Sequence, residues 1–116
     1  MPGCLTCYTL YIQMRFEWDE RKNRENKRKH GGISFELAAL VFEDERRLLR
    51  LDRVDEDGEQ RWHAIGFVSV GSGMGAVLLV VHVYREDDNG EEIIRIVSAR
   101  RAGPNDIRRY QAQEME

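Results

Sequence analysis

The stretch AVLLVVHVY, residues 76–84, decides how the rest of the chain is arranged. It is rich in β-branched side chains and apolar throughout except for His82, which predicts a buried strand. Such a strand belongs at the centre of a sheet. The apolar surroundings favour a hydrogen-bonded core histidine at position 82 over an acid–base group, while for His63, on a neighbouring predicted strand, acid–base chemistry stays open.

Further strands are predicted on both sides of this stretch. Arg61–Val70 alternates weakly between apolar and polar residues, and the glycine-rich segment Gly71–Gly75 joins it to the central strand as a hairpin. On the other side, Asn89-Gly90 is typical of a tight hairpin turn and leads into a strand at Ile93–Ser98. Leu48–Val54 is a further short strand. Because hairpins join antiparallel neighbours, we expect three or four antiparallel strands.

Helices are predicted before and after these strands. Asp19 is a good N-cap for a helix over Glu20–Lys29, whose basic last turn suits the negative end of the helix dipole. A second helix begins at a serine cap and covers residues 34–42, and a last one begins at a proline and covers residues 104–113. The expected fold class is α+β, with two N-terminal helices, the antiparallel sheet and a C-terminal helix. A short strand over residues 16–18 can precede them.

A chain of 116 residues is expected to form one domain. Residues 1–14 stand apart because they contain no charged residue, whereas the charged pattern begins at Arg15. We therefore expect a leader over residues 1–14 that is disordered or not native, with Met14 as the natural start, and a single domain over residues 15–116. The leader can still add an edge strand through Leu10–Ile12.

Composition and motifs exclude several classes of function. No apolar run approaches the ~18 residues of a membrane span and the first residues do not resemble a secretory signal, so we expect a cytoplasmic protein without a membrane partner. Cys4 and Cys7 form a lone CxxC pair, and a zinc site needs two further ligands. Phosphate-loop, dinucleotide-binding, zinc-peptidase and serine-hydrolase motifs are absent. We expect neither a metal site nor a cofactor.

Positive and negative charges are segregated along the chain, although the formal net charge is only −3. Residues 15–30 hold seven Lys or Arg against four acids, and residues 93–110 hold five Arg against one Asp. Residues 43–60 and 85–92 are acidic. Two basic segments that meet in space form a positive face, which suits a phosphate-rich partner such as RNA. The alternative is a solvated surface whose arginines pair with the acidic turns.

The basic segments supply the candidate site residues. In the first, Lys22, Asn26 and Lys29 follow one another at i, i+4 and i+7, with His30 next to them on the same side of the helix. The arginines of the second are Arg95, Arg100, Arg101, Arg108 and Arg109. Their planar guanidinium groups bind phosphate and stay charged. Tyr110 follows, and it either closes the core or reaches the basic face.

Five blocks of residues, in a fixed order along the chain, form a further pattern. They are Phe16–Asp19 with Lys22 and Asn26; Lys29–Gly31 with Ile33–Glu36; Glu59 with Arg61-Trp62 and Ile65-Gly66; Leu78–His82; and Ile94–Arg100 with Tyr110. This pattern resembles the BrnT family, which are toxins of type II toxin–antitoxin pairs. The resemblance extends from Arg15 to about Tyr110.

Membership of that family implies a RelE/ParE-like fold and a metal-independent endoribonuclease that degrades mRNA and arrests growth. Enzymes of this kind cut RNA by attack of a ribose 2′-hydroxyl on its own phosphate. The resemblance also implies a ribbon-helix-helix antitoxin, a BrnA-like protein, which neutralises the toxin. Operator DNA is then expected to be bound only through the antitoxin.

The resemblance further implies roles for residues at the matching positions. The catalytic candidates are Lys29, His30, Arg61, Arg100 and Tyr110. The RNA-binding candidates are Lys22 and Arg95, which are carried over from the family, and Asn26 and Arg101, which belong to the basic segments. In these roles the two arginines of the catalytic set stabilise the phosphorane, and the lysine or the histidine moves one proton.

Two other functions stay open. The first is a non-catalytic module that binds the antitoxin and acts in autoregulation of the operon. The second is a free-standing DNA-binding protein, which the missing helix-turn-helix pattern and the negative net charge disfavour. Cleavage of RNA by the purified chain separates the ribonuclease from both.

Overall fold

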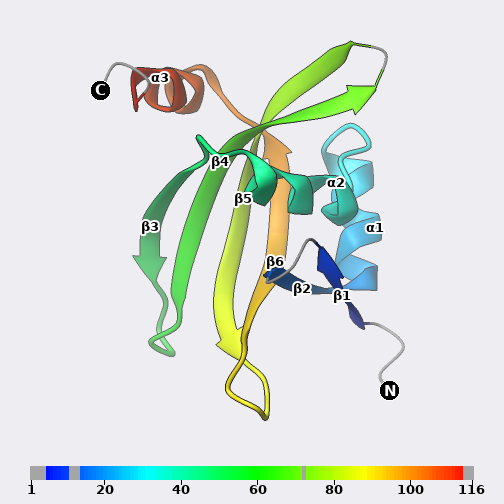
Figure 1. The fold of residues 1–116 in the computed structure, drawn as a ribbon, viewed down its shortest axis with the longest axis vertical. Coiled ribbons are helices and arrows are strands. Elements are labelled where there is room, and N and C mark those ends of the chain that lie inside the picture. Colours follow the sequence, from blue (N-terminus) through cyan, green and yellow to red (C-terminus); the bar gives the residue numbers. More distant parts are fainter. Residues whose placement is uncertain (1–4, 11–13, 72, 114–116) are drawn as a thin grey trace.

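The computed structural model describes residues 5–10, 14–71 and 73–113, which fold as one sheet with helices on both sides (Figure 1). The strands are β1 (Leu5–Leu10), β2 (Met14–Asp19), β3 (Leu48–Val54), β4 (Gln60–Gly71), β5 (Met74–Glu86) and β6 (Glu92–Arg101). The helices are α1 (Glu20–Lys29), α2 (Phe35–Ala39), the 3-10 helix η1 (Leu40–Glu43) and α3 (Pro104–Ala112). None of the helices in the described part of the chain has the length and apolarity that a membrane crossing needs.

The predicted arrangement of these elements is wrong, although the structure is α+β. Strands β2 to β6 form a mixed sheet that β1 extends at its edge, in the order β1-β2-β6-β5-β4-β3, and two strands precede the helices. It is not the RelE/ParE-like order of two helices and then three or four antiparallel strands. The difference arises because β2 runs parallel to β6, with Phe16 opposite Ile94. That pairing joins distant segments through a long crossover, which local patterns do not encode.

The first strand lies wholly within the expected leader over residues 1–14. β1 pairs antiparallel with β2, from Leu5 opposite Asp19 to Leu10 opposite Met14. The edge strand was expected through Leu10–Ile12, and residues 11–13 lie outside the described residues, as does Cys4.

Several local predictions are confirmed. α1 covers Glu20–Lys29, and the Asp19 side chain caps it by accepting a hydrogen bond from the backbone N–H of Arg21. Ser34 caps α2 in the same way, through the N–H of Leu37. The second helix is shorter than predicted, because the chain tightens into the 3-10 helix η1 after Ala39.

The stretch from Ala76 to Tyr84 lies within β5, which has β6 on one side and β4 on the other. Leu78 and Val80 are buried on one face of the sheet, and Leu79 and Val83 are buried on the other. A strand covered on both faces needs apolar residues at successive positions, which explains the uninterrupted run.

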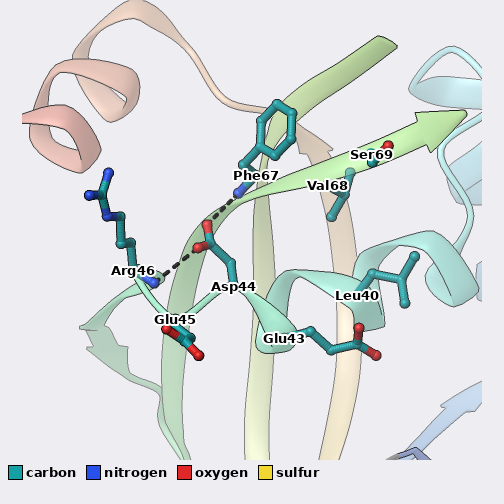
Figure 2. A pocket seen from close by; sticks show the side chains of 8 residues that line it. All are labelled: Leu40, Glu43, Asp44, Glu45, Arg46, Phe67, Val68 and Ser69. Carbon is teal, nitrogen blue, oxygen red and sulfur yellow. Dashed lines mark hydrogen bonds between the residues drawn. The ribbon is translucent and has the colours of Figure 1, made fainter. Parts of the chain in front are cut away.

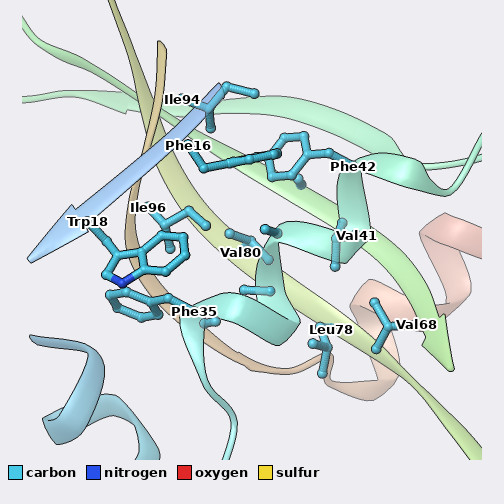
Figure 3. Close-up of a cluster of buried hydrophobic side chains, with 14 of the residues drawn as sticks. Phe16, Trp18, Phe35, Val41, Phe42, Val68, Leu78, Val80, Ile94 and Ile96 are labelled. Atoms are coloured by element: carbon cyan, nitrogen blue, oxygen red, sulfur yellow. The ribbon is translucent and has the colours of Figure 1, made fainter. Parts of the chain in front are cut away.

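The two faces of the sheet carry different cores. The face toward α2 and η1, called the helix face, holds the main core, in which Phe16, Trp18, Phe35 and Phe42 are at most 2% exposed (Figure 3). The opposite face, called the α3 face, holds a smaller cluster of Ile65, Leu79 and Tyr110. Polar residues therefore have room on the α3 face beyond the small area that α3 covers.

Asn26 fixes α1 against the edge of β6. Its side-chain Nδ2 donates to the carbonyls of Ala99 (2.8 Å) and Ile33 (2.9 Å), and its Oδ1 accepts from the N–H of Ala99 (3.1 Å). β2 pairs with β6 at Ile94 and Arg95 and does not extend along β6 as far as Ala99. The amide therefore satisfies the edge of β6 as a neighbouring strand would, and it sets which side of α1 faces the strand.

Candidate functional site

A hollow of about 210 Å³ opens between α1 and β6. The residues around this α1–β6 hollow are Lys22, Glu25, Asn26, Lys29, His30, Val97 and Ser98. The four from α1 stand at i, i+3, i+4 and i+7, which is one side of a helix. Because Asn26 in their midst is bonded to β6, the three charged members project beside that strand.

A β-bulge shapes the other wall of the hollow. Pairing between β5 and β6 shifts from Val81 opposite Ser98 to His82 opposite Ile96, which leaves Val97 as an extra residue on β6. Bulges bend a strand and change the direction of its side chains. Ser98 is thereby placed both at the hollow and on the α3 face, in one cross-strand row with Val81 and His63.

The charged groups of the hollow are open to solvent. Lys22, Glu25 and Lys29 are exposed, and none of them forms an ion pair with a described residue. His30 is half-buried, and its backbone N–H donates to the Asn26 carbonyl at 2.9 Å. Two ammonium groups, a carboxylate, an imidazole and a hydroxyl thus surround one small space. That set can bind a phosphate and exchange protons with a substrate.

Arg95 and Arg100 lie on β6 on either side of Ser98, and both are engaged. Arg95 donates to Glu17 Oε2 at 3.1 Å, and Arg85 donates to the same oxygen at 3.0 Å. Arg100 Nη1 is 3.5 Å from Asp106 Oδ2 and donates to the carbonyl of Arg101. These arginines border the α1–β6 hollow on the α3 face, but carboxylates share their charge.

The other two predicted arginines are not brought into this group. Arg61 lies at the start of β4. Its guanidinium is near two carboxylates, with Nε 3.6 Å from Asp55 Oδ2 and Nη2 3.8 Å from Glu59 Oε1. Arg101 pairs with Leu78, which belongs to the helix-face core, so Arg101 lies on the opposite face from Arg100. Of the nine predicted site residues, four lie at the hollow and two border it.

Tyr110 lies in the small core of the α3 face. It is 8% exposed, packs with Ile65 and Leu79, and its hydroxyl donates to Asp44 Oδ2. Of the two interpretations, the structure places Tyr110 in the core that holds α3 to the sheet.

Asp44 sits at a second, larger hollow of about 570 Å³ beside η1 and β4 (Figure 2). Burial raises the pKa of Asp44, but hydrogen bonds from the N–H of Phe67 and from Tyr110 outweigh it and hold the pKa below its ordinary value. Glu43 and Glu45 line this hollow as well. Its acidic lining does not suit a phosphate group.

The two strand histidines have different surroundings. His82 is fully buried, its ring lies edge-on to Phe42 and Tyr84, and its Nε2 is 3.2 Å from the Tyr84 hydroxyl, which confirms it as a core histidine. Burial lowers the pKa of His82 to about 4. His63 is half-buried on the α3 face, with Nε2 3.5 Å from Asp52 Oδ2. It lies two strands away from the hollow.

Two polar residues of the hollow were not predicted as site residues. Glu25 lies on the same side of α1 as Lys22 and Lys29, so helical spacing alone could have found it. Ser98 reaches the hollow because of the bulge at Val97, which no sequence signal marks. No group of three or more His, Cys, Asp or Glu that could hold a metal ion occurs among residues 5–10, 14–71 and 73–113.

The chain matches a known protein family. The family model of BrnT, described as the ribonuclease toxin of a type II toxin–antitoxin system, matches residues 18–106. This range includes every residue of the α1–β6 hollow. No curated protein matches the chain. Because the model covers most of the sequence, the chain belongs to the BrnT family of ribonuclease toxins of type II toxin–antitoxin systems.

Proposed function

We propose that the chain cuts RNA in the α1–β6 hollow, without a metal ion, by attack of a ribose 2′-hydroxyl on the adjacent phosphate. The observation that carries this proposal is the grouping of Lys22, Glu25, Lys29, His30 and Ser98 around one solvent-open space in a member of a ribonuclease family. The space holds positive charge for a phosphate, with a carboxylate and an imidazole that can accept or donate a proton.

In the proposed reaction the 2′-oxygen forms a bond to phosphorus as its proton moves to the Glu25 carboxylate. The bond from phosphorus to the 5′-oxygen breaks, and protonated His30 gives its proton to that oxygen. The products are a 2′,3′-cyclic phosphate and a 5′-hydroxyl end. The base stands on α1 and the acid at its C-cap, five residues later, and both line the α1–β6 hollow.

The lysines stabilise the charge that develops on the phosphorane. Lys29 lies between Glu25 and His30 in the sequence and is assigned the equatorial oxygens, where one such cation contributes about 3 kcal/mol. Lys22, two helical turns earlier on α1, binds the neighbouring phosphate of the strand. The Ser98 hydroxyl supplies one hydrogen bond from the β6 wall.

Arg95 and Arg100 extend the RNA path along β6. Arg100 can exchange a carboxylate for a phosphate, because its partly exposed ion pair with Asp106 adds at most about 1 kcal/mol. Arg95 can turn to a phosphate because Arg85 stays on the buried Glu17 carboxylate. Asn26, Tyr110 and Arg61 are left out of the chemistry: the first two complete their hydrogen bonds inside the fold, and the third pairs with the acidic turn after β3.

The chain is a toxin whose partner is a protein antitoxin, as its family defines. We propose further that this antitoxin is of the ribbon-helix-helix type, that it links the pair to operator DNA, and that the free toxin arrests growth by degrading mRNA. Expression of the chain with and without the neighbouring short reading frame tests this part. Growth arrest that persists in the presence of that product contradicts it.

Cleavage of a defined RNA by the purified chain, in buffer with excess chelator, tests the catalytic proposal. We expect cleavage that survives the chelator, products that end in a cyclic phosphate, and loss of cleavage in Lys29→Ala and Glu25→Gln. Lys27→Ala is the matched control, because Lys27 is exposed on α1 outside the hollow. Cleavage abolished by chelator contradicts metal independence. A chain that binds its antitoxin and cuts no RNA is instead a non-catalytic module of operon autoregulation.

A further inference from the structure

The helix face of the sheet is covered over half of its height. α2 and η1 lie across one half of β4 and β5, and the other half, toward the two turns at the bottom of Figure 1, has no helix in front of it. β3 borders this uncovered area and leaves Leu49, Leu51 and Val54 exposed by 38%, 44% and 54%. Aliphatic side chains in a row on an open sheet face mark an interaction surface.

Register places these side chains beside two aromatic residues. Leu49 pairs with Ala64 and Leu51 pairs with Trp62, so they share the helix face. Trp62 in turn stacks edge-on against Tyr84, with ring centroids 5.9 Å apart. We call the surface formed by Leu49, Leu51, Val54, Trp62 and Tyr84 the β3 patch.

A small hollow deepens the β3 patch at its end. It measures about 270 Å³ and lies between Trp62, Tyr84 and the turn that joins β3 to β4, with Gly58, Glu59 and Gln60 at its rim. An apolar surface with such a pocket accepts one protruding side chain of a partner, which is how interface anchors dock.

Two acidic turns border the β3 patch. The exposed acids of these turns are Glu56, Asp57, Glu86, Asp88 and Glu92, none of which forms an ion pair with a described residue. The field of one of them reaches the patch: burial raises the pKa of Tyr84, the charge of Glu92 raises it further, and the charge of Arg47 lowers it by less. An apolar centre with a negative border fits a partner segment that carries apolar side chains beside Lys or Arg.

We infer that the β3 patch is the docking surface for the antitoxin, which contributes an amphipathic, basic segment. This inference rests on the antitoxin partner that the toxin family entails and is independent of where RNA is cut. RNA does not fit here, because the acidic turns repel phosphate. A second copy of the chain fits poorly, because a symmetric contact brings like-charged turns together.

The test measures binding of the purified product of the short reading frame next to this chain's gene. We expect Leu51→Ser to raise the dissociation constant about tenfold and Leu51→Ser with Val54→Ser about a hundredfold, as for central apolar contacts. Met74→Ser is the matched control: Met74 is 64% exposed on the far hairpin, so its loss leaves the affinity unchanged. Circular dichroism and the melting temperature confirm that each variant is folded.

Charge at the border gives a second readout. Glu56→Lys with Asp57→Lys is expected to slow association about tenfold in low salt and to change it little in high salt. Unchanged affinity in the apolar variants, or no binding by the wild-type chain, overturns the inference. A dimer of the chain alone that Leu51→Ser dissociates also overturns it and makes a second copy the occupant.

The same variants separate this inference from the proposed function. β3-patch variants that lose the antitoxin and still cut RNA support both. If the wild-type chain cuts no RNA while Leu51→Ser loses the antitoxin, the docking surface stands and the catalytic proposal fails.

Discussion

The α1–β6 hollow and the β3 patch lie on one sheet and differ in how the strand beside them is covered and in the charge around them. In the hollow a side-chain amide closes the edge of β6 and surrounds it with lysines, whereas at the patch β3 is left open and its turns carry carboxylates. The hollow is small and polar, and the patch is apolar with a negative border. The difference shows how a chain of net charge −3 can present a surface for RNA: opposite charges are separated in space rather than reduced in number.

Asn26→Ala is expected to give the largest effect, because it breaks the hollow and spares the β3 patch. It leaves the backbone of Ala99 and the carbonyl of Ile33 without partners inside the protein, which costs about 3–5 kcal/mol in the free energy of unfolding. Urea denaturation measures the loss. The stability of Asn26→Asp, which keeps the acceptor and loses the donors, should lie between those of the wild type and Asn26→Ala. Equal stability of the wild type and both variants would show that the Asn26 hydrogen bonds to Ala99 and Ile33 do not hold α1 to β6.

Lys29→Ala and Glu25→Gln are expected to give the next largest effect, because they change the chemistry of the hollow without changing its backbone. We expect each to reduce the rate of RNA cleavage about 10²–10³-fold, the effect of removing one charge-stabilising or proton-transfer group. Single-turnover cleavage of a short RNA measures it. Binding of the antitoxin should be unaffected, and a parallel loss of antitoxin affinity shows that the two regions are not independent.

Acid is expected to lower the free energy of unfolding through His82, which lies on the helix face beside the β3 patch. His82 contacts Tyr84, and its pKa is about 4 when folded against about 6.5 when unfolded, so the unfolded chain binds the extra proton first. The contribution of His82 is complete above pH 6.5 and is lost as the pH falls to about 4, by about 3 kcal/mol in all. Urea denaturation between pH 7 and pH 4 measures it. His82→Leu should flatten that slope, and an unchanged slope rejects this origin.

The smallest effect is expected for Asp106→Asn. It removes the carboxylate beside Arg100 and keeps an oxygen that can accept from the N–H of Gly103 at the start of α3. Because exposed ion pairs contribute up to about 1 kcal/mol, RNA affinity should rise at most fivefold. Fluorescence anisotropy in a Lys29→Ala background, in which cleavage is expected to be slow, measures the gain. Asp88→Asn, in the turn that borders the β3 patch, should leave RNA affinity unchanged.

Sequence patterns identified the elements that are built locally and missed those that are built at a distance. Capping residues and hydrophobic periodicity predicted helix α1, its Asp19 cap and strand β3, because neighbours in the chain determine these features. The parallel pairing of β2 with β6 could not be predicted in this way, because it depends on contacts between residues 78 positions apart. The candidate site shows the same division: helical spacing grouped Lys22, Lys29 and His30, but the bulge that brings Ser98 to them has no local signature.

Asn26 illustrates why residue type alone does not assign a role. An amide on a basic helix has the chemistry of an RNA ligand, and its spacing from the lysines supports that interpretation. Its actual partner is the backbone of Ala99, 73 residues later. The residue is essential to the site because it holds the lysines in place.

Alternation along β4 has a genetic consequence. Trp62 belongs to the β3 patch, the proposed antitoxin surface, whereas His63, the next residue, lies on the α3 face. The β3 patch therefore shares no side chain with the α3 face, which carries Arg100 beside the proposed RNA site. On these two proposals, a single substitution can weaken antitoxin binding and leave RNA cleavage unchanged. If the free toxin arrests growth as proposed, cells that carry such alleles stop growing, so strand β3 should vary less among natural sequences than its exposure alone leads one to expect.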